Sequence, residues 1–204
     1  MPALISAAVE GPTDEAVAVR LIHHVGAEAG VVYGKQGKPH LRERVSGYNR
    51  AARHAPWLVL VDLDRDADCA PPLRTAWLPD PAPRLCFRVA VRAIEAWLLA
   101  DAETIADFLG VARSKVPALP ETLDHPRTAL VNLARTSRRK DIRQDMAPRE
   151  GSGRPVGPAY TSRLIEYAGK HWRPTEAAKR ADSLARAIRC LRWLARLSQF
   201  EQGN

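Results

Sequence analysis

Acidic residues follow three apolar segments of this sequence, each at the point where a strand is expected to end. Glu10 closes the first segment, Asp62 and Asp64 close the second, and Glu95 lies just after the third. Parallel strands end at the same edge of a sheet, and ligands bind in the crevice beyond that edge. Carboxylates gathered there repel one another unless a cation lies between them. Such oxygen ligands suit Mg²⁺ or Mn²⁺, which can activate water and stabilise a leaving oxygen in phosphoryl transfer.

The Asp-x-Asp pair at 62–64 is also used by other chemistries. A calcium loop of the EF-hand type needs Gly at the sixth position and Glu at the twelfth, where this sequence has Ala67 and Leu73. A phosphatase that forms an aspartyl phosphate normally has Thr or Val at the fifth position, which is Asp66 here, and carries the motif on its first strand. A metal-dependent nucleotide-sugar transferase stays open, although it does not explain Glu10.

Some of these acids have an ordinary structural explanation as well. Asp14 and Glu15 follow Thr13, the expected N-cap of a helix, and negative charge is favourable in the first turn of a helix. Glu95 lies three residues after Arg92, which is the spacing of a helical ion pair. The metal hypothesis therefore stays open for Asp14 and Glu95.

Residues 3–100 alternate between apolar segments and amphipathic ones, which predicts an α/β fold with a mostly parallel sheet of about four strands. The central strand is the continuous apolar run that begins at Trp57, because such a run is typical of a strand buried on both faces. The other expected strands are 3–9, 31–33 and 84–91, and the expected helices lie after Thr13 and at 41–54, 73–78 and 92–101.

From Asp101 onward the pattern is helical and basic. Helices are expected at 103–109, 127–135, 160–168 and 182–197, and the glycine- and proline-rich segment 149–158 is expected to be a loop, either a lid beside the site or a linker. Residues 127–196 hold 17 Arg and Lys against six Asp and Glu. Such a surface favours phosphate contacts with nucleic acid, on whose bases Tyr160, Tyr167 and Trp172 could stack; a solvated helical face is the alternative.

Composition narrows the class of protein further. The net charge of +8 favours polyanionic partners, and the three scattered cysteines, Cys69, Cys86 and Cys190, are expected to be reduced thiols. No apolar run approaches the roughly 18 residues that a membrane span needs. The N-terminal residues lack the basic region of a signal peptide, so we expect a soluble cytoplasmic protein without a membrane partner.

Two motifs together resemble a known family. Residues 10–14, Glu-Gly-Pro-Thr-Asp, followed by residues 61–64, Val-Asp-Leu-Asp, resemble the TOPRIM domain of topoisomerases, primases and the overcoming-lysogenization-defect nucleases, and especially small bacterial proteins of that type. The resemblance covers roughly residues 3–100 and includes the Glu-x-Trp-Leu sequence at Glu95. It implies a Rossmann-like TOPRIM fold at 1–100. The helical and basic pattern of residues 101–204 predicts a C-terminal extension packed on that domain.

The resemblance also implies roles for particular residues. Glu10 and Asp14 would form the first acidic motif, Asp62 and Asp64 the second, and Glu95 the third acidic position, all holding Mg²⁺ or Mn²⁺. These nucleases carry a downstream lysine that stabilises charge on the phosphate. The candidates here are Lys140 and Lys170, although neither lies in a confirming motif.

The resulting hypothesis is a metal-dependent nuclease that acts on DNA or RNA, as an effector in bacterial defence. A second hypothesis is a non-catalytic or conditionally active subunit that binds nucleic acid beside a separate ATPase, since the sequence has no nucleotide-binding P-loop. An enzyme that matures ribosomal RNA is a third. Whether the protein is a homo-oligomer stays open.

Overall fold

The computed structural model of the protein describes the backbone of residues 2–202 and the side chains of residues 2–197. Four strands form the sheet: β1 (Leu4–Val9), β2 (Glu28–Gly34), β3 (Trp57–Asp62) and β4 (Leu85–Ala90). The helices are α1 (Pro12–His24), α2 (Lys38–Ala51), α3 (Ala70–Trp77), α4 (Ile94–Ala100), α5 (Ala102–Leu109), α6 (Pro126–Arg135), α7 (Lys140–Met146), α8 (Tyr160–Lys170), α9 (Pro174–Ala178) and α10 (Asp182–Gln202), with short 3₁₀ turns at Arg113–Lys115 and Pro120–Thr122.

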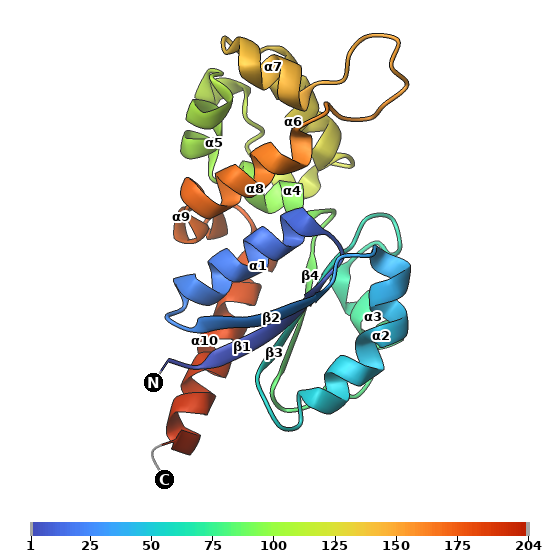
Figure 1. Cartoon of the computed structure of the whole chain (residues 1–204), viewed down its shortest axis with the longest axis vertical. Helices are drawn as coiled ribbons and strands as arrows, with labels where there is room; N and C mark the ends of the chain where they lie inside the picture. Colours follow the sequence, from blue (N-terminus) through green and yellow to red (C-terminus); the bar gives the residue numbers. More distant parts are fainter. Residues whose placement is uncertain (1, 203–204) are drawn as a thin grey trace.

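The sheet is entirely parallel, with strand order β2-β1-β3-β4, and helices flank it, so the fold is α/β and Rossmann-like, as the sequence predicted. All six residues of β3 are buried, which explains its continuous apolar sequence. Helices α1 and α10 cover one face of the sheet and α2 and α3 the other (Figure 1). Helices α4 to α9 lie beyond the edge at which the strands end (Figure 1).

One hydrophobic cluster continues from the sheet into the helices that follow residue 101. It joins Ile5 and Leu58 of the sheet to Trp97, Tyr167 and Leu191, all of which are fully buried. A second cluster fills the face beneath α2 and α3. The helices after residue 101 therefore share a core with the sheet and hold the ends of its strands in place.

Several details differ from the sequence predictions. Helix α1 is capped by Gly11 and begins at Pro12, so Thr13 is not the N-cap, and α4 begins at Ile94 because Arg92 has a left-handed backbone (φ 61°). Helices α7 and α9 were not predicted. Both are short, and the helices of the C-terminal half depend on tertiary packing for stability.

The expectation of three reduced thiols was wrong for two of them. A disulfide joins Cys86 of β4 to Cys190 of α10, and Cys69 is free and exposed. The two bonded cysteines are 104 positions apart in the sequence, without any spacing motif to pair them. Only the packing of α10 against β4 brings them together.

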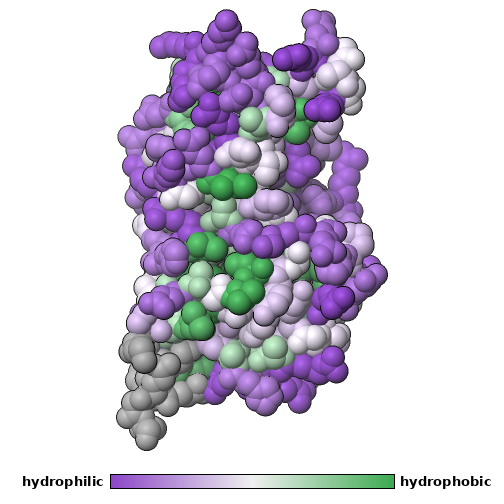
Figure 2. Space-filling view, in the orientation of Figure 1, coloured by the Kyte–Doolittle hydropathy of each residue, from purple (hydrophilic) through white to green (hydrophobic). Residues whose placement is uncertain are grey.

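In the part of the chain that the structure describes, no helix is both long and apolar enough to cross a membrane. Hydrophilic residues dominate the upper part of the face shown in Figure 2, over the helices beyond the sheet. The exposed large apolar side chains include Leu4, Val31 and Tyr33 of β1 and β2.

Candidate acidic site

Glu10 and Asp62 meet at the ends of neighbouring strands. The backbone N–H of Asp62 donates a 2.7 Å hydrogen bond to Oε1 of Glu10. Strands β1 and β3 are paired in the sheet, so the residue after β1 and the last residue of β3 reach the same edge. The predicted convergence of these two acids is therefore present.

Asp62 connects the end of β3 to the start of α4. Its Oδ1 accepts a 2.8 Å hydrogen bond from the backbone N–H of Ile94, the first residue of that helix. The next residue, Glu95, is only 2% exposed. The turn between β4 and α4 thus brings Glu95 to the same edge as Asp62.

Asp14 belongs to this group as well. It lies in the first turn of α1 yet is only 7% exposed, as is Asp62. Its Oδ1 is buried and has no hydrogen-bond partner among the described residues. A carboxylate that merely caps a helix would lie in solvent, so capping does not explain the burial of Asp14.

Glu95 is paired with a cation. Its Oε1 accepts a 2.8 Å hydrogen bond from Nε of Arg127 in α6, and the hydroxyl of Tyr160 lies 3.4 Å away. Its second oxygen, Oε2, is buried without a partner in the described part of the chain. The helical pair with Arg92 that the spacing suggested does not form, because α4 begins only after Arg92.

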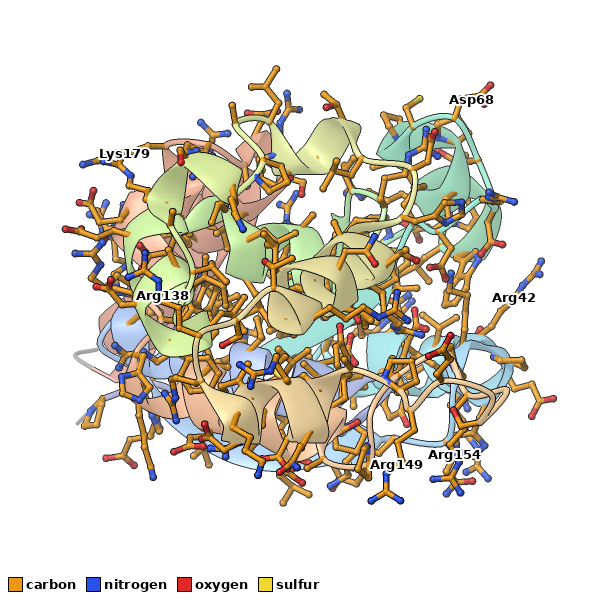
Figure 3. All side chains as sticks on the ribbon, turned by 90° about the horizontal axis from the view of Figure 1, so that it is seen from above. Arg42, Asp68, Arg138, Arg149, Arg154 and Lys179 are labelled. Atoms are coloured by element: carbon orange, nitrogen blue, oxygen red, sulfur yellow. A yellow bond between two sulfur atoms is a disulfide. The ribbon has the colours of Figure 1, made fainter. Side chains whose placement is uncertain are left out.

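A cavity of about 220 Å³ opens beside these side chains. Asp14, Asp62 and Glu95 line it together with Arg127 and Tyr160. Pro155 and Val156 also line it, so the predicted loop at 149–158 borders the site. Arg149 and Arg154 of that loop point outward, away from the body of the protein (Figure 3).

Burial and mutual repulsion raise the pKa values of three of these acids. Desolvation raises the pKa of Glu10 to about 7, and the hydrogen bond from Asp62 opposes this only in part. Desolvation and the charge of Glu95 raise the pKa of Asp14 to about 6. The pKa of Asp62 lies well above its usual value because of desolvation and then the charges of Asp14, Glu95 and Glu10. The site therefore favours protons or cations.

Asp64 is not part of the buried group. Its side chain is 54% exposed and accepts a 2.5 Å hydrogen bond from Nζ of Lys38, which also contacts Asp66 at 2.9 Å. Its backbone is left-handed (φ 48°), so the chain turns away from β3 immediately after Leu63. Asp68 lies at the surface (Figure 3). Of the Asp-x-Asp pair, only Asp62 lines the acidic cavity.

The predicted basic partners do not lie at these acids. Lys140 is exposed at the start of α7, which packs on α6 and α8, and Lys170 is exposed with Glu166 3.9 Å away. Instead, Arg127 pairs with Glu95 and Lys38 pairs with Asp64. In the sequence, Arg127 is only one residue of the basic segment 127–196. The only signal for a role of Arg127 was its place after Pro126, at the start of a helix.

The predicted stacking residues are in the core. Tyr160 is 4% exposed and Tyr167 and Trp172 are completely buried, so none of them offers a ring face to a base. The indole N–H of Trp172 donates to the carbonyl of Trp97 at 3.2 Å. Nucleic-acid stacking by these three side chains is therefore excluded as the molecule stands.

The donor chemistry of the acidic cavity fits a hard divalent cation. Four carboxylates lie at one edge, and two buried oxygens, on Asp14 and Glu95, lack hydrogen-bond donors. Within residues 2–197, however, no three His, Cys, Asp or Glu side chains are arranged as a ready set of ligands. One oxygen each of Glu10, Asp62 and Glu95 is held by a protein donor. Binding a cation would therefore require side chains of the site to rotate.

Comparison with known proteins found no relative of this chain. No protein-family model, no curated protein and no solved structure matches this chain.

Proposed function

We propose that this protein is a Mg²⁺- or Mn²⁺-dependent nuclease that hydrolyses phosphodiester bonds in DNA or RNA. The observation that supports this most strongly is that Asp14, Asp62 and Glu95 line one cavity, with Glu10 bonded to the backbone of Asp62 beside them, although like charges repel. Proteins keep buried carboxylates together at a cost, and a cation is the usual partner that offsets it. The resemblance of the two acidic motifs to the TOPRIM family supports the same chemistry.

Asp14, Asp62 and Glu95 would hold the ion, since they line the cavity, with Glu10 beside them. A bound ion of this kind activates water and stabilises the charge on the leaving oxygen. The raised pKa of Asp62 and Asp14 means that these carboxylates release protons when a cation binds. Metal binding would therefore strengthen as the pH rises.

Glu10 is suited to proton transfer. Its pKa of about 7 places it between the protonated and ionised forms at neutral pH. Its Oε1 is fixed by the backbone of Asp62, which orients the carboxyl group at the end of the sheet. We assign Glu10 the role of general acid or base.

Arg127 takes the role that Lys140 or Lys170 was expected to have. Its side chain is 59% exposed and lines the cavity, so it can meet a phosphate oxygen while Nε stays on Glu95. The charge of Glu95 raises its pKa further above the usual range, so the guanidinium remains charged at any working pH. A fixed positive charge at this position would stabilise the charge that develops on a phosphate.

The proposed partner is nucleic acid, on the ground of the net charge of +8. Part of that charge is used internally: Arg163 pairs with three acids and Arg173 with two. Arg138, Arg149 and Arg154 are exposed, and Arg149 and Arg154 extend outward (Figure 3). Binding through such residues would be salt-sensitive and largely independent of sequence.

The test is cleavage of plasmid DNA, single-stranded DNA and structured RNA in Mn²⁺ by the wild type and by Asp62→Asn. Asn keeps the shape of the side chain but removes the charge, so cleavage should fall by at least about a hundredfold. Asp107→Asn, at an exposed position on α5, is the matched control and should cleave like the wild type. Equal cleavage by Asp62→Asn would refute the proposed site.

A non-catalytic or conditionally active nucleic-acid-binding subunit is the second candidate. The observation that favours it is the pairing of Glu95 with Arg127 and of Asp64 with Lys38, which occupies acids that would otherwise be free for a metal. This candidate predicts salt-sensitive binding of nucleic acid without cleavage of any substrate in Mn²⁺. It also predicts that Asp62→Asn leaves that binding unchanged or tightens it.

A further inference from the structure

A second cavity, of about 310 Å³, lies at the free edge of β4. Three arginines from separate elements line it: Arg74 of α3, Arg88 of β4 and Arg186 of α10. Arg88 lies in the middle of a strand, where a long charged side chain is unusual. The side of the sheet that faces α10 is otherwise apolar, as the buried Cys86 and Ala90 on either side of Arg88 show.

Two of these arginines have buried donors without acceptors. The Nε atoms of Arg74 and Arg88 are inaccessible to solvent, and no hydrogen-bond acceptor for either lies among the described residues. A buried polar group without a partner destabilises a fold, most of all when it is charged. Such unpartnered donors do not stabilise the fold. Donors of this kind are typical of a site that binds a ligand.

The guanidinium groups also repel one another. Desolvation, followed by the charges of Arg74, Arg189 and Arg186, lowers the pKa of Arg88 to about 10. An arginine normally has a pKa far above the neutral range, so this shift reflects first the burial of Arg88 and then a concentration of positive charge around it. The positive charges come from Arg74 of α3 and from Arg186 and Arg189 of α10.

The two carboxylates in the wall of this cavity are bonded to groups other than Arg74 and Arg88. Glu121 accepts hydrogen bonds from the backbone N–H groups of Asp182 and Ser183 and from the Ser183 hydroxyl, so it caps the start of α10. Asp182 accepts a 2.7 Å hydrogen bond from Nε of Arg186. Neither acid neutralises Arg74 or Arg88, and the positive charge of those two faces the cavity uncompensated.

We propose that this cavity binds a phosphate group, with Arg74 and Arg88 as its principal donors. A guanidinium presents paired N–H groups that match phosphate oxygens, and a dianion would cancel the repulsion within the cluster. The site is independent of the proposed phosphodiester chemistry, since Arg74 and Arg88 do not line the acidic cavity.

The phosphate can come from a small molecule or from a nucleic-acid backbone. Val91 lines the phosphate cavity, and its neighbour Arg92 lines a third cavity that contains Arg127, which also borders the acidic site. A strand of nucleic acid could therefore contact both sites. The two sources share the same donors and are separated by experiment.

The experiment is a calorimetric titration of the full-length protein with inorganic phosphate at low ionic strength. Wild type should bind, and Arg88→Gln and Arg74→Gln should each weaken binding by at least about tenfold, the loss expected for one charge-assisted contact. Arg50→Gln is the control, because Arg50 is exposed in the last turn of α2 and does not line the phosphate cavity. Failure of the wild type to bind, or equal binding by Arg88→Gln, would overturn the proposal.

Thermal unfolding without phosphate separates a ligand site from a structural one. A ligand site predicts that Arg88→Gln unfolds at the same temperature as the wild type or higher, because repulsion is relieved, while the stabilisation by added phosphate is lost. If Arg88→Gln unfolds at a lower temperature and phosphate still stabilises it, the arginines are structural and the proposal fails.

Two further titrations identify the source. A nucleoside monophosphate that binds at least as tightly as inorganic phosphate, and loses affinity in Arg88→Gln, supports a small ligand. A single-stranded oligonucleotide that binds more tightly than either, with the same loss, supports a backbone phosphate. Binding of both compounds that is identical in wild type and Arg88→Gln would contradict the assignment.

Discussion

The backbone N–H of Asp62 donates a 2.7 Å hydrogen bond to the carboxyl group of Glu10, and this contact fixes how the acidic site is built. One acid supplies its backbone and the other its side chain, so the ends of β1 and β3 are joined directly. The side chain of Asp62 therefore remains free to accept a hydrogen bond from the backbone N–H of Ile94, at the start of α4. The same contact holds Glu10 in a position where burial raises its pKa to about 7.

The raised pKa values predict how stability depends on pH. Folded Glu10 and Asp14 have pKa values of about 7 and about 6, above the values near 4 that they have in an unfolded chain. Between roughly pH 4 and pH 7 the folded state therefore holds more protons, so the free energy of unfolding should fall as the pH rises through this range. The loss should be on the order of a few kcal/mol.

Chemical denaturation at several pH values measures this loss, and the metal provides the control. In saturating Mn²⁺ the slope between pH 5 and pH 7 should flatten or reverse, because the ion binds the ionised carboxylates. A free energy of unfolding that increases steadily from pH 5 to pH 7 without metal would mean that these acids are stabilised in their charged form, contrary to the account.

The pairing of Arg127 with Glu95 predicts an asymmetric mutational response. Arg127→Gln leaves the buried carboxylate of Glu95 without its cation and should lower the free energy of unfolding by about 1–3 kcal/mol. Glu95→Gln should cost less, because Arg127 is 59% exposed and regains water. In the double variant most of the loss from Arg127→Gln should disappear. Additive losses in a double-mutant cycle would show that the pair is not coupled.

Gly34 is the last residue of β2 and precedes the loop that places Lys38 beside Asp64. Its backbone has φ 87°, and an added Cβ would lie 2.2 Å from the carbonyl oxygen of Val9, so Gly34→Ala should destabilise the protein by about 2 kcal/mol or more. Gly47→Ala in α2 is the control, because nothing lies within 4 Å of its Cβ position. That substitution should be neutral or stabilise by up to about 1 kcal/mol. Similar losses in both variants would argue against the close approach at Val9.

The disulfide predicts one free thiol per chain. Thiol titration in denaturant without reductant should detect Cys69 alone, and three thiols would show that Cys86 and Cys190 are not bonded. Reduction opens a cross-link between residues 104 positions apart, so it should lower stability by about 2–4 kcal/mol. Cys69→Ser, at an exposed position, should respond to reductant like the wild type.

The strands were predictable from the sequence because their signal is local. The continuous apolar run of β3 predicts a buried central strand. The acids at the ends of β1 and β3 predict that Glu10 and Asp62 meet at one edge of the sheet. Contacts between distant segments carry no local signal. The ion pair of Arg127 with Glu95 and the disulfide depend on how α6 and α10 pack, and neither spacing nor composition encodes that packing.

For the Asp-x-Asp pair, the alternation of side chains along a strand predicts the wrong position for Asp64. An ideal strand would already send Asp62 and Asp64 to the same face, but β3 ends at Asp62 and the chain turns at Asp64. Asp64 is consequently exposed and pairs with Lys38 instead of lining the acidic cavity. Asp14, for which helix capping was the alternative explanation, is buried at the site because α1 begins right beside the end of β1.

The most direct test of the central claim is a calorimetric titration of Mn²⁺ into the metal-free protein at neutral pH, with Asp62→Asn and Asp107→Asn in parallel. The account predicts binding with proton release by the wild type and by Asp107→Asn, and at least about tenfold weaker binding by Asp62→Asn. Absence of Mn²⁺ binding by the wild type, or equal affinity in Asp62→Asn, would contradict it.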